Sequence, residues 1–294
     1  MYYTVLKKWI DVDLIDWNGI SANPNAIQLL ESNPDNIKWY YFSENPNGIN
    51  LIKKYQELIF WPKIANNPNA IDLIEKNLDK ISWFYISENP NAMKIIKQNM
   101  DKINWVFLSQ NPNAIDIIEN NLDKINWWSL SKNPNAIHIL ENNLARVHWN
   151  ILSSNPNAIN ILENNLEKVD WIILSGNPNA IHILEKNFHK INWSMLSENP
   201  NAVHILEKNI SYIDWSRIVK NYNAMGIIEK HINIINNLLR NDPIARNYFF
   251  KNPSIFTLDY KGISQNNLVL NCEIIKVSLH PSRVIKWIEE DIEF

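Results

Sequence analysis

Residues 111–132 have the sequence NPNAIDIIENNLDKINWWSLSK, and a second version of it, NPNAIHILENNLARVHWNILSS, follows directly. A motif of the NPNA type recurs every 22 residues, and a degenerate copy, NYNA, begins at Asn221. This strict period is the sequence signature of a solenoid, in which each unit packs on its neighbours. One tryptophan keeps the same period, at Trp17, Trp39, Trp61, Trp83, Trp105, Trp127, Trp149, Trp171, Trp193 and Trp215.

The first half of the unit predicts an amphipathic helix. Asparagine is a good N-cap and proline is favoured at the first helical position, so we expect a helix to begin at Asn111-Pro112. The apolar residues from Ala114 to Ile118 would cover an arc of about 160°, with polar residues on the opposite side.

The second half of the unit predicts another short helix, from Leu122 to about Ser131. The first copy carries a second Asn-Pro start signal at the equivalent place, Asn33-Pro34, which favours a helix there. On such a helix Asn126 would point inward between apolar neighbours, a conflict that this prediction leaves unresolved.

The competing model is a leucine-rich-repeat-like α/β horseshoe. Leu122, Ile125 and Trp127 fit the start of its L-x-x-L-x-L pattern, and 22 residues lie within its range of repeat lengths. Leu130, however, stands where that pattern requires asparagine. We therefore favour an all-α solenoid of two-short-helix repeats over the horseshoe.

The sequence divides into three parts that together predict one elongated domain. Residues 1–22 form an N-terminal cap and half repeat, residues 23–242 form ten tandem repeats, the last degenerate, and residues 243–294 form a C-terminal capping segment. Irregular helix starts mark the last part, which is expected to end in a helix over residues 283–290.

Composition narrows the function. Net charge is −3, which argues against general binding of nucleic acid, because such binding needs a basic face. The single cysteine, Cys272, excludes a disulfide-stapled secreted protein and favours a reducing compartment inside the cell. The N-terminus lacks the apolar run of a signal peptide, and no stretch of about 18 apolar residues predicts a membrane span.

The consensus NPNAIxLLExNxDKIxWxxLSx resembles the Asn-Pro-Asn-Ala repeat proteins of giant DNA viruses of the mimivirus kind. The resemblance covers roughly residues 17–285, and NPSIF and HPSR near the C-terminus are similar to closing elements of that family. Copies from Asn45 and from Asn221 depart most from the consensus. The resemblance implies an intracellular viral protein, in the host cytoplasm, the virus factory or the virion, and supplies no catalytic residues.

Neither catalysis nor a cofactor is predicted. No Gly-rich phosphate loop, HExxH, GxSxG or Cys/His cluster occurs, and a catalytic residue should break the repeat period, which no polar residue does convincingly. His138, His182 and His204 share one exposed slot, but no cysteine or acidic partner completes a zinc ligand set. We therefore expect no enzyme activity, no cofactor and no metal.

Three periodic rows have structural interpretations. The tryptophans are interpreted as core between repeats rather than as a surface for stacking bases or sugars. The acidic and basic rows are interpreted as pairing with each other. The acidic row is Glu75, Glu119, Glu141, Glu163, Glu185 and Glu207, and the basic row is Lys80, Lys102, Lys124, Arg146, Lys168 and Lys190.

The predicted function is a non-catalytic scaffold for protein–protein interaction, with an unidentified protein as partner. Side chains vary within an invariant frame in the slot that holds Asp116, His138, His182 and His204, and beside the tryptophans at Phe84, Tyr85 and Trp128. These seven residues are the candidate interaction surface. The alternative is a self-assembling structural or packaging component of a virus.

Overall fold

The computed structural model describes residues 4–260 and residue 264. Each repeat contributes two short helices, and the described residues contain only two strands, β1 (Thr4–Leu6) and β2 (Phe256–Leu258). The predicted all-α repeat solenoid is confirmed, and the segment from Leu122 to Asn126 contains no strand of a horseshoe. The helix expected over residues 283–290 and Cys272 lie outside the described residues.

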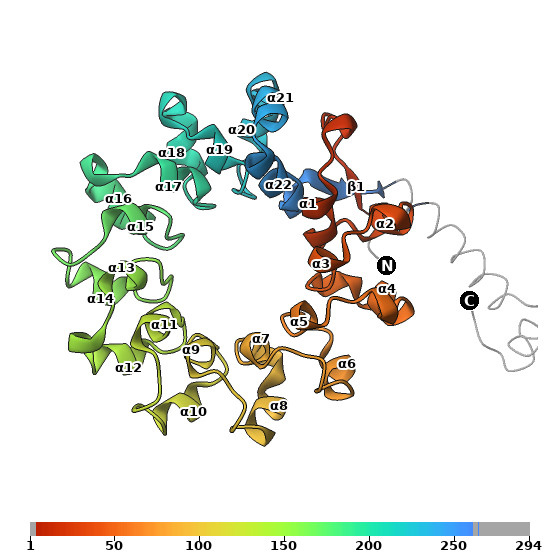
Figure 1. Cartoon of the computed structure of the whole chain (residues 1–294). Coiled ribbons are helices and arrows are strands. Elements are labelled where there is room, and N and C mark those ends of the chain that lie inside the picture. Colours follow the sequence, from red (N-terminus) through yellow and green to blue (C-terminus); the bar gives the residue numbers. More distant parts are fainter. Residues whose placement is uncertain (1–3, 261–263, 265–294) are drawn as a thin grey trace, which may run out of the picture.

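Figure 1 shows the helices in two concentric series around a ring. The inner series comprises α1 (Trp17–Ala22), α3 (Trp39–Phe42), α5 (Trp61–Ile64), α7 (Trp83–Ile86), α9 (Trp105–Leu108), α11 (Trp127–Lys132), α13 (Trp149–Leu152), α15 (Trp171–Ser175), α17 (Trp193–Glu198), α19 (Trp215–Ile218) and α22 (Pro243–Lys251). The outer series comprises α2 (Ile27–Glu31), α4 (Ile49–Lys54), α6 (Ile71–Glu75), α8 (Met93–Gln98), α10 (Ile115–Glu119), α12 (Ile137–Glu141), α14 (Ile159–Glu163), α16 (Ile181–Lys186), α18 (Val203–Lys208), α20 (Met225–Lys230) and α21 (Ile232–Asn241).

Short 3₁₀ turns occur in many of the connections. They are η1 (Val12–Leu14), η2 (Pro34–Asn36), η3 (Pro46–Gly48), η4 (Gln56–Leu58), η5 (Pro90–Ala92), η6 (Leu144–Arg146), η7 (Phe188–Lys190), η8 (Ile210–Tyr212) and η9 (Pro253–Ile255).

The NPNA motif forms a turn, so the predicted helix start at Asn111 is wrong. The side chain of Asn111 accepts a hydrogen bond from the backbone N–H of Asn113 at 3.0 Å, and the α-helix begins only at Ile115. Asn-Pro does start a helical turn, but in the repeats at Asn45 and Asn89 that turn is 3₁₀ and precedes the α-helix. The motif thus fixes the entry of the chain into the outer helix.

The second predicted helix begins five residues later than expected, at Trp127 instead of Leu122. Asn126 has extended backbone angles and is the N-cap of α11, where its side chain accepts from the N–H of Ser129 at 2.8 Å. Because an N-cap side chain turns back onto its own helix, the polar residue meets no apolar interior. This role removes the conflict that an inward-pointing Asn126 posed.

Asparagine side chains join successive repeats. Asn111 is buried, and its Nδ2 donates to the carbonyls of Ser87 and Asn89, which flank the start of the preceding repeat, at 3.0 and 3.1 Å. Asn113 donates to the carbonyl of Pro90 at 2.9 Å. The same bonds recur from repeat to repeat, so the NPNA turns form a continuous hydrogen-bonded ladder. Buried backbone carbonyls need such partners, which explains the strict recurrence of the first asparagine.

A serine ladder parallels the asparagine ladder. The hydroxyl of Ser109 donates to the carbonyl of Trp105 at 2.6 Å and accepts from the N–H of Asn126, in the next repeat, at 2.9 Å. The equivalent serine is fully buried in each copy that has one. Where the serine is present, its hydroxyl therefore anchors the start of one inner helix to the end of the previous one.

The hydrophobic core runs along the stack, between the inner and outer helices. Most repeats bury one alanine from the NPNA turn and leucine or isoleucine from both helices, such as Leu108, Ala114 and Ile118, all fully buried. The tryptophans pack against this core but remain partly exposed. The prediction that the tryptophans are core residues is therefore only partly right, because one face of each indole is not covered by the core.

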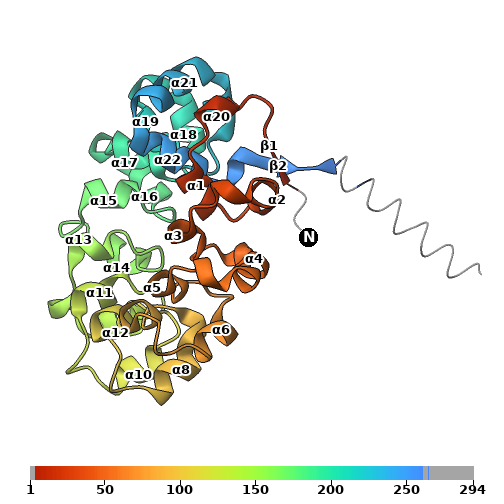
Figure 2. The ribbon, with the colours of Figure 1, turned by 45° about the vertical axis from the view of Figure 1, so that its right-hand side comes forward.

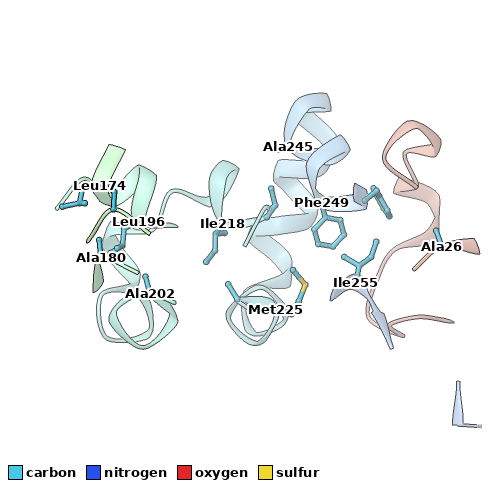
Figure 3. Packing of buried hydrophobic residues seen from close by; sticks show 14 of the residues in the cluster. Ala26, Leu174, Ala180, Leu196, Ala202, Ile218, Met225, Ala245, Phe249 and Ile255 are labelled. Atoms are coloured by element: carbon cyan, nitrogen blue, oxygen red, sulfur yellow. The ribbon is translucent and has the colours of Figure 1, made fainter. Parts of the chain in front are cut away.

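The prediction of an elongated domain is wrong, because the ribbon closes on itself (Figures 1 and 2). Strand β1 pairs antiparallel with β2, and Asn23 donates to the carbonyls of Phe250 and Asn252 at 2.9 and 3.0 Å. Figure 3 shows the buried side chains continuing from Ile218 through Phe249 and Ile255 towards Ala26, all members of one cluster. The two divergent ends, expected to cap a rod separately, instead pack on each other.

Candidate functional site

The three histidines of the variable slot each contact a glutamate of the preceding repeat. His138 lies 2.6 Å from Glu119, and His182 lies 2.8 Å from Glu163, measured from Nε2 to Oε1. The third pair, His204 and Glu185, is separated by 3.1 Å. All three histidines are exposed, and within the described residues no group of three potential metal ligands occurs.

Charge in this slot is matched to the preceding repeat. Lys94 forms an ion pair with Glu75 at 3.0 Å, in the same arrangement as the histidine pairs. In the sequence, the slot holds aspartate where the preceding repeat carries a lysine in place of the glutamate, as in Asp116 after Lys97 and Asp72 after Lys53. The sequence variation in this slot, interpreted above as a sign of a recognition surface, is therefore also explained by pairing between neighbouring repeats.

The basic row pairs with the tryptophans instead of the acidic row. Lys124 Nζ lies 5.4 Å from the ring centroid of Trp105, and Arg146 Cζ lies 5.1 Å from that of Trp127. The same cation–π contact recurs at Lys80, Lys102, Lys168 and Lys190, each over the tryptophan of the preceding repeat. The predicted pairing of the two charged rows is thus wrong. A cation over the indole face covers the side that the core leaves open.

Aromatic side chains gather on helices α3 to α9 of the inner series. We call these rings, together with the lysine that lies among them, the aromatic patch. It consists of Tyr40, Tyr41, Phe60, Lys63, Phe84, Tyr85 and Phe107. Phe84 contacts both Tyr85 and Phe107, and the rings of Tyr40 and Phe60 are 5.0 Å apart. Tyr40 and Phe84 are 47% and 43% exposed, which is unusual for large rings so close together.

Lys63 joins the two halves of the aromatic patch. Its Nζ lies 5.2 Å from the ring centroid of Tyr40 and 5.4 Å from that of Tyr85, and it forms an ion pair with Glu44. Burial by itself would lower the pKa of Lys63, but the hydrogen bond to Glu44 and the two tyrosines outweigh it and raise the pKa above its usual value. The charged lysine therefore holds rings from α3 and α7 around one point.

Trp128, the third predicted aromatic residue, is 47% exposed in α11. It occupies the slot directly after the repeated tryptophan, which is also the slot of Tyr40, Phe84 and Val106. Later copies place Asn150, Ser194 and Ser216 there, with Ile172 as the apolar exception. Exposed aromatic residues in this slot are thus confined to the first half of the repeat array.

The predicted residues therefore fall into two sets. Phe84 and Tyr85 belong to the aromatic patch, and Trp128 occupies the same repeat position as Phe84. The histidines lie in the outer helices, where each contacts a glutamate of the preceding repeat. The prediction omitted Phe60 and Lys63. Both lie in the copy NPNGINLIKKYQELIFWPKIAN, whose departure from the consensus was the available signal.

Comparison with protein-family models, with curated proteins and with solved structures found no match for this chain. Within residues 4–260 and 264, every helix is too short or too polar to span a bilayer.

Proposed function

We propose that the ring is a non-catalytic scaffold for protein–protein interaction, and that the aromatic patch is where its partner binds. The observation that carries this proposal is the break in the repeat pattern. Ten copies share one frame, but in the slot directly after the repeated tryptophan exposed aromatic residues occur only in the first half of the array, at Tyr40, Phe84 and Trp128. A single partner needs one site, so its site should be the place where the copies differ.

The physical properties of the aromatic patch support binding of a protein segment. Tyrosine and phenylalanine supply large contact areas for the loss of only two side-chain torsions each, and aromatic residues dominate binding energy at interfaces. The rings of Tyr40, Phe60 and Phe84 already contact neighbouring rings, so less conformational freedom is lost on binding. Tyrosine hydroxyls and Lys63 supply hydrogen-bond donors among the apolar groups.

The test is affinity capture from expressing cells, followed by binding measurements on each purified candidate. Tyr40→Ser with Phe84→Ser removes two exposed rings of the aromatic patch. Ile172→Ser is the matched control, because Ile172 occupies the same slot and is 55% exposed, but lies outside the aromatic patch. We expect a partner that binds the wild type and the control and is lost from the double variant. A partner that binds all three forms equally would contradict the proposal.

The second candidate function is self-assembly into a larger structure. The meeting of the two chain ends favours it, because an interface between ends is one that separate molecules could share. A sedimentation series over protein concentration distinguishes the two functions in the folded state, since a strict monomer disfavours self-assembly. The intracellular viral setting remains a prediction of the sequence resemblance.

A further inference from the structure

The two ends of the described chain meet at an interface that we call the seam. It joins residues 4–25, which contain β1 and α1, to residues 240–258, which contain α22 and β2. Helix α22 approaches α1 closely at Gly19, where a Cβ atom would lie 2.5 Å from the carbonyl oxygen of Asn247. No covalent bond holds the seam in the described residues, so its two faces are separable.

The seam has the same hydrogen-bond chemistry as the contacts between interior repeats. Asn23 donates to the carbonyls of Phe250 and Asn252, as Asn45 donates to those of Ser21 and Asn23. Asn25 donates to the carbonyl of Pro253 at 3.0 Å, as Asn113 donates to that of Pro90 at 2.9 Å. The N-terminal face thus recognises the C-terminal face as if it were the preceding repeat.

Contacts found only at the seam make this recognition specific. Asp16 accepts from Asn247 at 3.3 Å, and Asp11 forms an ion pair with Arg240 at 3.3 Å. The paired strands add Val5 opposite Thr257. An interior repeat offers neither these partners nor a glycine opposite α22, so the N-terminal face fits the C-terminal face better than any other surface of the ring.

We expect the seam to be the part of the structure that forms last. Its side-chain hydrogen bonds join residues 227 to 231 positions apart, whereas the ladder bonds of interior repeats join residues 22 to 24 apart. Contacts of long sequence separation carry the larger cost of loop closure. A folding chain therefore exposes two finished, complementary faces before the ring closes.

We propose that the seam is a binding site for a second copy of this chain. Residues 4–25 of one molecule dock on residues 240–258 of another, and the reciprocal exchange closes two rings. Such a contact between unlike faces gives a closed dimer when both molecules exchange the same element. The proposal is independent of the aromatic patch, which lies on other helices.

The test uses two variants that each carry one cysteine at the seam, so a disulfide can form only between two molecules. Both carry Cys272→Ser, and one also carries Val5→Cys while the other carries Thr257→Cys. Residues opposite each other in antiparallel strands are spaced as a disulfide requires. The copies are unfolded, mixed and refolded oxidatively at about 1 μM and at about 300 μM, the range in which contacts between molecules compete with folding. We expect a disulfide-linked dimer at the higher concentration, with Val5→Cys joined to Thr257→Cys.

A control copy carries Gly226→Cys in place of Thr257→Cys, because Gly226 is exposed and no atom lies within 4 Å of its would-be Cβ. Pairing raises the local concentration of the two thiols, so the control should link at least about tenfold less. Equal linking of both pairs, or no linked dimer at the higher concentration, would overturn the proposal. Phe84→Ser in both copies should leave linking unchanged, and its loss would assign association to the aromatic patch instead.

Discussion

At the scale of single residues, buried polar side chains and matched volumes determine how one repeat fits the next. Each first asparagine of the motif satisfies two carbonyls that flank the start of the preceding repeat while it caps its own turn, as Asn111 does. Volume is matched just as locally. Gly48 replaces the usual alanine only where Phe42 replaces the usual leucine or isoleucine, because a Cβ at Gly48 would lie 2.6 Å from the Phe42 ring.

Replacing a ladder asparagine should be costly. Asn111→Ala removes two donated hydrogen bonds and one accepted bond from a buried site, so we expect a loss of about 2–4 kcal/mol in the free energy of unfolding. The control Asn113→Ala removes one exposed bond to Pro90 and should cost about 1 kcal/mol or less. Urea denaturation measures both. Equal losses in the two variants would show that the buried ladder has no special weight.

The volume match between Gly48 and Phe42 predicts a compensating pair of substitutions. Gly48→Ala overpacks the site and should destabilise by about 1–3 kcal/mol. Adding Phe42→Leu recreates the usual pair of leucine and alanine and should recover most of that loss. A double-mutant cycle gives the coupling energy directly. Strictly additive effects of the two substitutions would refute the match.

At the scale of elements, the sequence predicts the period, the helical class and two segments per unit. It misplaces both starts, because Asn-Pro predicts an α-helix and does not distinguish it from a turn that precedes one. Asn126 and its equivalents carry the missing signal, since asparagine and aspartate before Trp105, Trp127, Trp171 and Trp215 fit an N-cap. Of the aromatic patch, only Phe84 and Tyr85 are among the predicted surface residues, and Phe60 and Lys63 lie in a copy that departs strongly from the consensus.

One N-cap should make stability depend on pH. Burial by itself would raise the pKa of Asp214, but hydrogen bonds donated by Ser194, Ser216 and backbone N–H groups outweigh it and lower the pKa below its ordinary value of 3.8. Because the folded-state pKa is lowered, the ionised carboxylate stabilises the fold above that ordinary value, and this stabilisation is lost as pH falls through the folded-state pKa.

The variant Asp214→Asn keeps a capping side chain without a titratable group. We expect a lower Tm than that of the wild type at about pH 6, and a difference that shrinks as the pH falls towards about 3. Thermal melts at several pH values measure this. A constant difference in Tm across that range would show that ionised Asp214 contributes nothing to stability.

At the scale of the whole molecule, small rotations between repeats add up until the ends meet. A sequence pattern contains no measure of that rotation, which is why the ring could not be predicted and a rod was expected. One signal was available. Asn252-Pro253 repeats the start of the motif, and the structure shows it serving as the preceding turn for Asn23 and Asn25.

Closure makes the number of repeats critical. Deleting residues 111–132 leaves a junction that copies the native one, so the remaining repeats should fold and keep their helix content per residue. The shortened array should not bring its ends into register, which leaves both seam faces exposed. We expect a loss of stability larger than that of one interior unit, together with association in light scattering. A shortened protein that is monomeric and nearly as stable as the full chain would mean that closure contributes little.

The most direct test of the closed ring is a disulfide across the seam within one molecule. A single chain carries Val5→Cys, Thr257→Cys and Cys272→Ser, and the folded protein is oxidised mildly while dilute. The ring places residues 5 and 257 opposite each other in paired strands, so we predict rapid and nearly complete formation of the disulfide in the monomer. An open or extended stack would hold these ends apart. Two free thiols that persist in the folded monomer would contradict the closed ring.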